Sequence, residues 1–127
     1  MSLSLRTTLI CDDVRREDNG KFLLIGVYTP NIVVYQLPAT LQLCAFQVWE
    51  SDARAAHQFR VTVRHTESGA VVLERSASME VPEAGPGFLV LRFGGLRFEV
   101  VGTYELVVTL DEADRPAGTH VFTVRLK

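Results

Sequence analysis

The sequence lacks the long apolar run that a membrane-spanning helix needs, since no apolar stretch approaches the ~20 residues that cross a bilayer. Its first residues, Met1 to Arg6, also lack the basic region and uninterrupted apolar stretch of a secretory signal. We therefore expect a cytoplasmic protein that has no membrane among its partners.

A strong charge of either sign is missing as well. The chain has 13 basic residues (Lys and Arg) and 15 acidic ones, which gives a net charge of −2 at pH 7. Proteins that bind nucleic acid usually present a basic face, so this balance argues against nucleic acid as a partner.

Cysteine is scarce: Cys11 and Cys44 are the only two, and each lies in an apolar stretch. Two isolated thiols fall short of a zinc site, which needs four ligands. Free cysteine behaves as a small apolar residue, and a chain without a secretory signal keeps its thiols reduced. We expect both to be buried and reduced, with a disulfide as the alternative.

Patterns typical of catalysis are also absent. No serine lies in a nucleophile-elbow pattern, and no helix follows the glycines that could otherwise cradle a phosphate. We therefore expect these glycines to be turn and bulge residues, and we predict no catalytic residue, no cofactor, no small-molecule substrate and no enzyme activity. The glycines concerned are Gly85, Gly87, Gly94 and Gly95.

The three histidines, His57, His65 and His120, are the remaining candidates for a base or a metal ligand. His57 and His65 lie on one predicted strand, more than ~25 Å apart if it is extended, so they cannot share a metal. We expect each histidine to mark the point where an apolar face meets solvent.

What the sequence does contain is a series of strand-sized apolar runs separated by turn residues. Residues 57–65 alternate between an apolar and a polar face, as a half-buried strand does. No stretch has a helical period, so we predict an all-β fold: one domain over residues 1–127, an antiparallel sandwich of about seven to nine strands. The predicted strands are Leu5–Val14, Lys21–Tyr28, Ile32–Tyr35, Thr40–Trp49, His57–His65, Ala70–Val81, Phe88–Phe93, Thr103–Leu110 and Thr119–Leu126.

Turn signals separate these runs. Asn19-Gly20 tolerates positive φ and predicts a hairpin, and residues 66–69 predict another. We expect residues 82–87 to break all regular structure and Gly94-Gly95 to interrupt a strand.

The segment before and after Tyr104 favours an immunoglobulin-like sandwich. In such folds a tyrosine that opens a late strand turns its hydroxyl back onto nearby backbone, and Tyr104 fits that role. Neither cysteine follows Tyr104 by two residues, and Trp49 does not lie between the cysteines. The domain is therefore not of the antibody type.

The first thirty residues carry distinctive motifs: Cys11-Asp12-Asp13-Val14-Arg15, then Gly20-Lys21, then Leu24-Ile25-Gly26-Val27-Tyr28. They resemble a family of uncharacterised bacterial proteins that share a domain of unknown function. The resemblance implies a bacterial cytoplasmic β-sandwich and supplies no activity, substrate or site.

Acidic residues suggest one possible metal site. If Ile32–Tyr35 does not cross the sandwich, the first hairpin and the loops after Trp49, Val81 and Leu110 share one end. Calcium takes six to eight oxygen ligands, and such loops supply carboxylates. Arginines in the same loops and the lack of an Asp-x-Asp pattern favour the simpler interpretation that these acids fix turns. The candidate calcium ligands are Asp12, Asp13, Asp111, Glu112 and Asp114.

The short piece between Pro30 and Pro38 is a possible interaction edge. Proline lacks the N–H that a central strand donates, so we expect this piece at the edge of a sheet. Such an edge can accept a strand from a partner or from a second copy, and the alternative is packing against a loop. The residues are Ile32, Val33, Val34 and Tyr35.

The sequence thus favours a non-enzymatic protein-interaction or scaffold module that binds another protein or itself. The alternative is a calcium-dependent, C2-like binding module that uses the acidic loops.

Overall fold

The computed structural model describes residues 2–29, 31–112 and 115–127. Within these ranges the regular structure is all strand, which confirms the predicted all-β class, and no helix is present that could span a membrane. The strands are β1 (Leu3–Arg16), β2 (Phe22–Val27), β3 (Asn31–Val34), β4 (Ala39–Ser51), β5 (Ala55–His65), β6 (Val71–Val81), β7 (Gly85–Phe98), β8 (Gly102–Leu110) and β9 (Arg115–Leu126).

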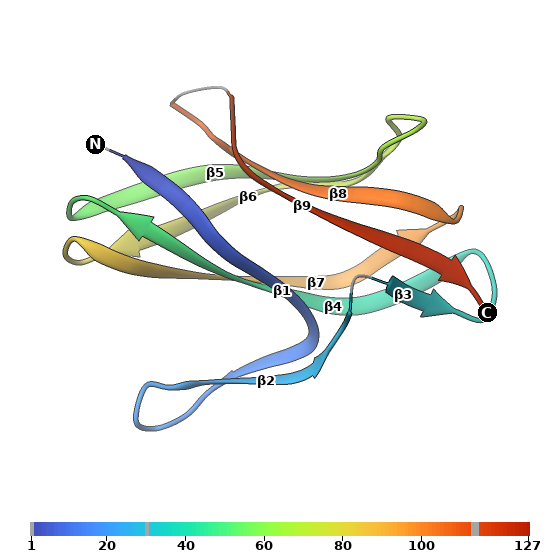
Figure 1. The fold of residues 1–127 in the computed structure, drawn as a ribbon, viewed down its shortest axis with the longest axis horizontal. Helices are drawn as coiled ribbons and strands as arrows, with labels where there is room; N and C mark the ends of the chain where they lie inside the picture. Colours follow the sequence, from blue (N-terminus) through green and yellow to red (C-terminus); the bar gives the residue numbers. More distant parts are fainter. Residues whose placement is uncertain (1, 30, 113–114) are drawn as a thin grey trace.

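The strands form two sheets that lie one above the other (Figure 1). A four-stranded sheet has the order β2-β1-β4-β7, and a five-stranded sheet has the order β3-β9-β8-β5-β6. Our prediction of antiparallel pairing throughout is wrong at one place, because β3 runs parallel to β9. No hairpin joins these two strands, so nothing in the chain forces them to run in opposite directions.

The core between the sheets forms because alternate residues of each strand point inward. In β5 the inward residues are buried and the others are exposed or half-buried, as the sequence pattern predicts. Trp49 of β4 lies against Phe59 of β5, with 5.3 Å between ring centroids. Its indole N–H donates to Oε1 of Gln47 (3.1 Å), so both buried polar groups are hydrogen-bonded.

Strand β7 is longer than predicted. It begins at Gly85 and runs through Gly94-Gly95 to Phe98, so only residues 82–84 remain as a loop. The register against β4 shifts between Leu41 and Leu43, where the two glycines stand opposite a single residue. The glycines therefore form a β-bulge, as their expected role as bulge residues implies, and they do not end the strand.

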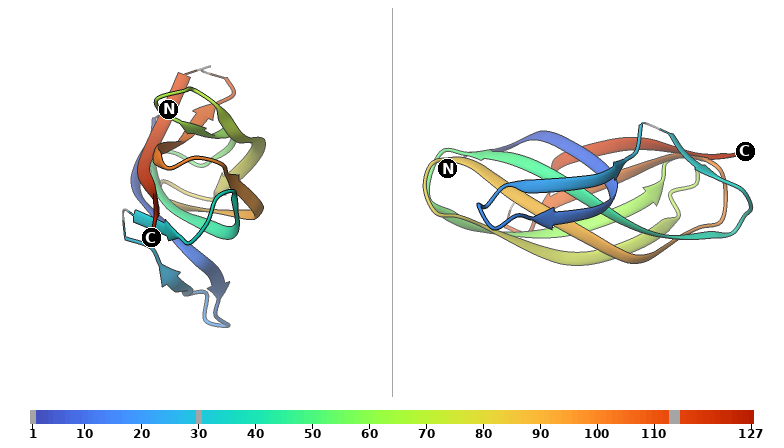
Figure 2. Two further views of the ribbon diagram at one scale, coloured as in Figure 1. Left: turned by 90° about the vertical axis from the view of Figure 1, so that its right-hand side faces the viewer. Right: turned by 90° about the horizontal axis from the view of Figure 1, so that it is seen from below.

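The β1–β2 hairpin forms an additional layer outside the sandwich. After Cys11, β1 leaves β4 and pairs with β2 alone, and the hairpin lies on the side that faces away from the five-stranded sheet (Figures 1 and 2). At this bend Gly26 has φ +67°, and a Cβ there would collide with the Asp12 carboxylate. The predicted turn is confirmed: the N–H of Gly20 donates to the carbonyl of Glu17 (2.9 Å).

The hairpin packs on a second apolar cluster, which we call the outer cluster. Phe22 of β2 contacts Phe46 of β4 and Phe88 of β7, with ring centroids 5.0 and 5.3 Å apart. The four-stranded sheet is therefore apolar on both faces. The outer cluster comprises Cys11, Val14, Cys44 and Phe46, with Phe22, Leu24, Val48 and Val90 packed against them.

Two histidines are buried, contrary to our expectation that all three mark the boundary with solvent. His57 is 2% exposed and stacks on Phe59, and His65 is also buried, whereas His120 is half-buried. Neither ring nitrogen of His57 has a hydrogen-bond partner among the described residues. A buried polar group without a partner costs stability.

We predict that His57→Leu raises the free energy of unfolding by about 1 kcal/mol, because it removes two unpaired polar atoms at nearly constant volume. Urea denaturation followed by circular dichroism measures the change. The matched control is His65→Leu, where both ring nitrogens have partners; we expect it to lose about 1–2 kcal/mol. A loss of stability in both variants would contradict the prediction.

We also predict that Phe22→Ala lowers the free energy of unfolding by about 2 kcal/mol, because it removes the ring that joins the hairpin to the outer cluster. Leu23→Ala is the control, since Leu23 lies on the exposed face of the same strand. Its effect should stay within about 0.5 kcal/mol in the same urea titration. Equal effects would show that the hairpin does not depend on this contact.

Candidate functional site

The predicted interaction edge is a true sheet edge. Strand β3 pairs on one side only, with β9, where Ile32 stands opposite Val124 and Val34 opposite Leu126. The N–H of Lys127 extends the pairing by donating to the carbonyl of Val34 (2.9 Å). The position expected from the flanking prolines is therefore confirmed.

The apolar side chains of this edge are only partly exposed. Ile32 and Val34 are buried (1% and 4% exposed) and fill the core, whereas Val33 is 48% exposed and Tyr35 76% exposed. Because the carbonyl of Val34 faces β9, alternation turns the backbone groups of Val33 outward. No backbone group in the described ranges pairs with that outer side.

Basic residues border the exposed side of β3. Arg125 stands opposite Val33 in the ladder, so its side chain lies on the same face. The ammonium of Lys127 lies 5.4 Å from the centroid of the Tyr35 ring, a cation–π contact. We call this surface the β3 edge surface; it comprises Val33, Tyr35, Arg125 and Lys127, which are all exposed.

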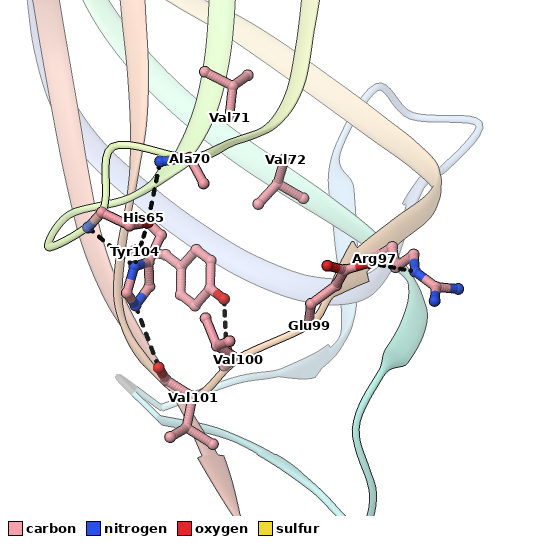
Figure 3. A pocket seen from close by; sticks show the side chains of 10 residues that line it. His65, Ala70, Val71, Val72, Arg97, Glu99, Val100, Val101 and Tyr104 are labelled. Carbon is pink, nitrogen blue, oxygen red and sulfur yellow. Dashed lines mark hydrogen bonds and ion pairs between the residues drawn. The ribbon is translucent and has the colours of Figure 1, made fainter.

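A hollow of about 560 Å³ lies where the β5–β6 and β7–β8 turns meet (Figure 3). Its walls are valines from β6 and from the β7–β8 turn, and the Arg97–Glu99 ion pair (3.2 Å) lies at its rim. The buried rings of His65 and Tyr104 also line it, at 5.0 Å between centroids. No sequence pattern indicates this hollow, because it depends on how far two turns reach past the sheets.

His65 holds the β5–β6 turn in place. Its Nε2 lies 3.3 Å from the carbonyl oxygen of Val101, which can only accept, so we assign the ring proton to Nε2. Nδ1 then accepts from the hydroxyl of Ser68 (2.9 Å) and from its backbone N–H (3.3 Å). The Ser68 oxygen in turn accepts from the N–H of Ala70 (3.2 Å). These bonds stabilise the turn that the sequence predicts at residues 66–69.

Tyr104 makes the hydrogen bond expected of a tyrosine corner. Its hydroxyl donates to the carbonyl of Val100, four residues earlier, and burial raises its pKa. This predicted role is confirmed. Both ring nitrogens of His65 and the hydroxyl proton of Tyr104 are thus used in hydrogen bonds within the chain.

The predicted acidic end forms only in part. The loops after β4, β6 and β8 lie at one end, because Ser51 stands opposite Gly85, Ala55 opposite Val81, and Leu110 opposite Phe59 in the first half of β5. The first hairpin does not join them, so this part of the prediction is wrong. Leu3 of β1 stands opposite Ser51, which means that β1 starts at that end and runs away from it.

Asp12 and Asp13 therefore lie far from the other candidate ligands. Asp13 bonds Arg92, which stands opposite Cys44 in the ladder, and the span of β4 from Cys44 to Ser51 is roughly 23 Å at ~3.3 Å per residue. Asp111 and Glu112 follow β8 at the loop end, and Asp114 lies outside the described residues. No three His, Cys, Asp or Glu side chains in the described ranges come together as a metal group.

The two aspartates instead hold the bend of β1. The hydroxyl of Tyr28 donates to Asp12 (2.8 Å), and burial together with this bond raises the pKa of Tyr28 to about 12. Asp13 bonds Arg15 (2.9 Å), Arg92 (3.0 Å) and the N–H of Val14 (2.9 Å). The Arg15 guanidinium, with these other bonds, holds the pKa of Asp13 below its usual value.

His120 lines a smaller hollow of about 240 Å³ between β1 and β9, beside Tyr28, Ile32 and Phe122. The ring of His120 stacks on that of Phe122, with centroids 6.5 Å apart. Burial lowers the pKa of His120, because the imidazolium loses contact with water.

Comparison with known proteins gives a family but no activity. Residues 6–125 match the family model described as a family of unknown function, DUF6941. No curated protein matches the chain.

Two similar solved structures are an alkylpurine DNA glycosylase, AlkC, from Pseudomonas fluorescens bound to DNA with an abasic site analog, and a β-glucosidase from Listeria innocua in complex with isofagomine. The first is 11% identical (TM-score 0.49; 97% of this chain and 30% of that one). The second is 8% identical (TM-score 0.45; 99% and 17%). This chain thus spans less than a third of the length of either protein.

We predict that His120 makes stability fall in mild acid. Its pKa is lowered in the folded state, so below about pH 6.5 the unfolded chain takes up the proton first and gains stability. The free energy of unfolding should therefore fall less in His120→Gln than in the wild type between about pH 7.5 and pH 5.5. Urea titrations at both pH values measure this, with the exposed Thr119→Gln as control. Equal falls in wild type and His120→Gln would contradict it.

Proposed function

Because the chain belongs to DUF6941, a family of unknown function, we propose from its own surfaces that it is a non-enzymatic protein-interaction module. The observation that carries the proposal is the β3 edge surface. It combines outward backbone groups with the exposed side chains of Val33 and Tyr35 on a strand that pairs on one side only. Edge strands of this kind accept a further strand from a partner.

The β3 edge surface also favours one kind of partner strand. Arg125 and Lys127 border the apolar pair Val33 and Tyr35. An extended segment that alternates apolar and acidic residues would bury its apolar side chains on the pair and place carboxylates beside the two cations. A neutral apolar strand would leave both charges without a counterion.

The interior supports binding at the surface. Between the sheets there is a void of about 10 Å³ lined by core side chains such as Leu43, Phe93 and Leu106. A void of this size barely holds one water molecule. This void is too small for a ligand larger than water, which supports a binding site on the outside of the sandwich.

The proposal also includes a more specific fold, an immunoglobulin-like sandwich, and a cellular location for the protein, the cytoplasm. The Tyr104 corner and the place of β3 beside β9, the last strand, support an immunoglobulin-like sandwich. Two buried free cysteines suit the reducing cytoplasm, and the resemblance noted above implies a bacterial one. The calcium-dependent alternative has less support, because Asp12 and Asp13 lie apart from Asp111 and Glu112.

The test uses displayed peptides of about ten residues that alternate apolar and acidic residues, together with light scattering of the protein alone to detect a second copy as partner. We expect the protein to bind a peptide or to form a dimer. Val33→Lys should raise the dissociation constant of that complex at least tenfold, roughly the effect of losing a hot-spot residue. Val71→Lys is the matched control, because Val71 is exposed to a similar degree at another place. A thermal melt verifies that both variants fold.

Two results would overturn the proposal. One is a monomer that selects no peptide under these conditions. The other is a bound strand that Val33→Lys and Val71→Lys weaken equally. A rise in the melting midpoint with millimolar calcium over chelator would favour the calcium-dependent alternative.

A further inference from the structure

Cys11 and Cys44 stand directly opposite each other in the antiparallel ladder of β1 and β4. Both are free thiols, and they are 0% and 5% exposed within the outer cluster. The sequence predicts two separate buried thiols, and only the register between the strands reveals that they are neighbours. The pair does not take part in the proposed interaction function.

The geometry of this pair suits a disulfide bond. Opposite residues of antiparallel strands have Cα atoms about 4.5–5.5 Å apart, and their side chains share a face. Disulfides span Cα distances of about 4.4–6.8 Å, so the spacing of directly opposite residues lies within the range that an S–S bond can join.

Of the two cysteines, Cys44 is the more accessible, at 5% exposed against 0% for Cys11. Cys44 lines a shallow hollow of about 180 Å³ together with Asp13, Gln42 and Arg92. A guanidinium nitrogen of Arg92 lies 3.7 Å from Sγ of Cys44. Arg92 is itself held by Asp13 (3.0 Å) and by the carbonyl of Val14 (2.6 Å). Cys11 does not line this hollow, and its thiol donates to the carbonyl of Asp13 (3.4 Å).

We propose that Cys11 and Cys44 form a reversible redox pair, with hydrogen peroxide or a small organic hydroperoxide as oxidant. Cys44 attacks the O–O bond, which breaks, and a sulfenic acid forms on Cys44 while the leaving oxygen departs as water or alcohol with the thiol proton. Arg92 donates a hydrogen bond to that leaving oxygen. Cys11 then displaces the hydroxyl from the Cys44 sulfur, so that an S–S bond forms and water leaves.

The two steps balance. Two thiols and one peroxide give one disulfide and two waters, or one water and one alcohol. The sulfurs lose two electrons, which the peroxide takes up. A dithiol reverses the change by thiol–disulfide exchange.

The disulfide would join β1 to β4 at the point where β1 leaves the sheet for the hairpin. Oxidation therefore ties the base of the β1–β2 hairpin to the sandwich. A disulfide that closes a loop of this kind restricts the unfolded chain and stabilises the folded one.

The first experiment treats the wild-type protein with hydrogen peroxide and maps its cysteines by mass spectrometry of peptides. We expect a disulfide between Cys11 and Cys44 within one monomer, full reversal by dithiothreitol, and a melting midpoint about 10 °C higher in the oxidised protein. Thiols that persist in excess peroxide, or a disulfide between two monomers, would overturn the proposal.

Single-cysteine variants test the order of the steps. In Cys11→Ser the sulfenic acid on Cys44 has no partner and should be trapped by dimedone, whereas in Cys44→Ser the thiol of Cys11 should stay reduced. Arg92→Met should slow oxidation of Cys44 roughly tenfold, the effect of losing one good hydrogen bond to the leaving oxygen. Arg97→Met, an exposed arginine elsewhere on β7, is its control. Dimedone on Cys11 in Cys44→Ser would refute the assigned order.

Discussion

Both faces of β4 are buried, and the rest of the molecule depends on this constraint. On the inner face, Ala45 and Trp49 face the five-stranded sheet; on the outer face, Cys44 and Phe46 lie under the hairpin. A strand in the middle of a sheet satisfies its backbone through its neighbours, here β1 and β7, so it can lose contact with water on both sides. The β1–β2 hairpin covers the outer face of β4 and shields it from water.

This arrangement explains where polar side chains occur inside the protein. Gln47 lies on the inner face and bonds both Trp49 and the hydroxyl of Thr8, so its burial is compensated. Arg92 lies beside the outer cluster and uses its guanidinium on Asp13 and on the carbonyl of Val14. The bend of β1 is thus held by charged groups from β7 as well as by apolar packing.

Local patterns predicted most of the strands, because alternation in β5 and turn residues such as Asn19-Gly20 act within a few residues. They also predicted the Tyr104 corner and the edge position of β3. The length of β7 was missed, since Gly94-Gly95 causes a bulge when β4 supplies a partner and a break when nothing does. The Gly94-Gly95 sequence alone does not indicate whether the strand bulges or ends at this point.

The remaining errors concern relations between distant segments. The bend of β1 removes the first hairpin from the acidic end, and the register of β1 on β4 brings Cys11 to Cys44. One signal was available in the sequence: residues 43–46 are four consecutive apolar residues and do not alternate, and in the structure they are all buried. A central strand without a polar face indicates a further layer outside its sheet, and the structure shows that the β1–β2 hairpin supplies that layer.

The place of Trp49 has a consequence for spectroscopy. It is the one tryptophan of the chain, it is fully buried, and it stacks on Phe59 in the core between the sheets. Its emission therefore reports on the separation of the two sheets. The hairpin has no tryptophan, so its detachment would leave the emission of Trp49 nearly unchanged. Circular dichroism would record the loss of hairpin structure all the same. A change in circular dichroism before any change in tryptophan emission would therefore show that the hairpin detaches while the two sheets stay packed.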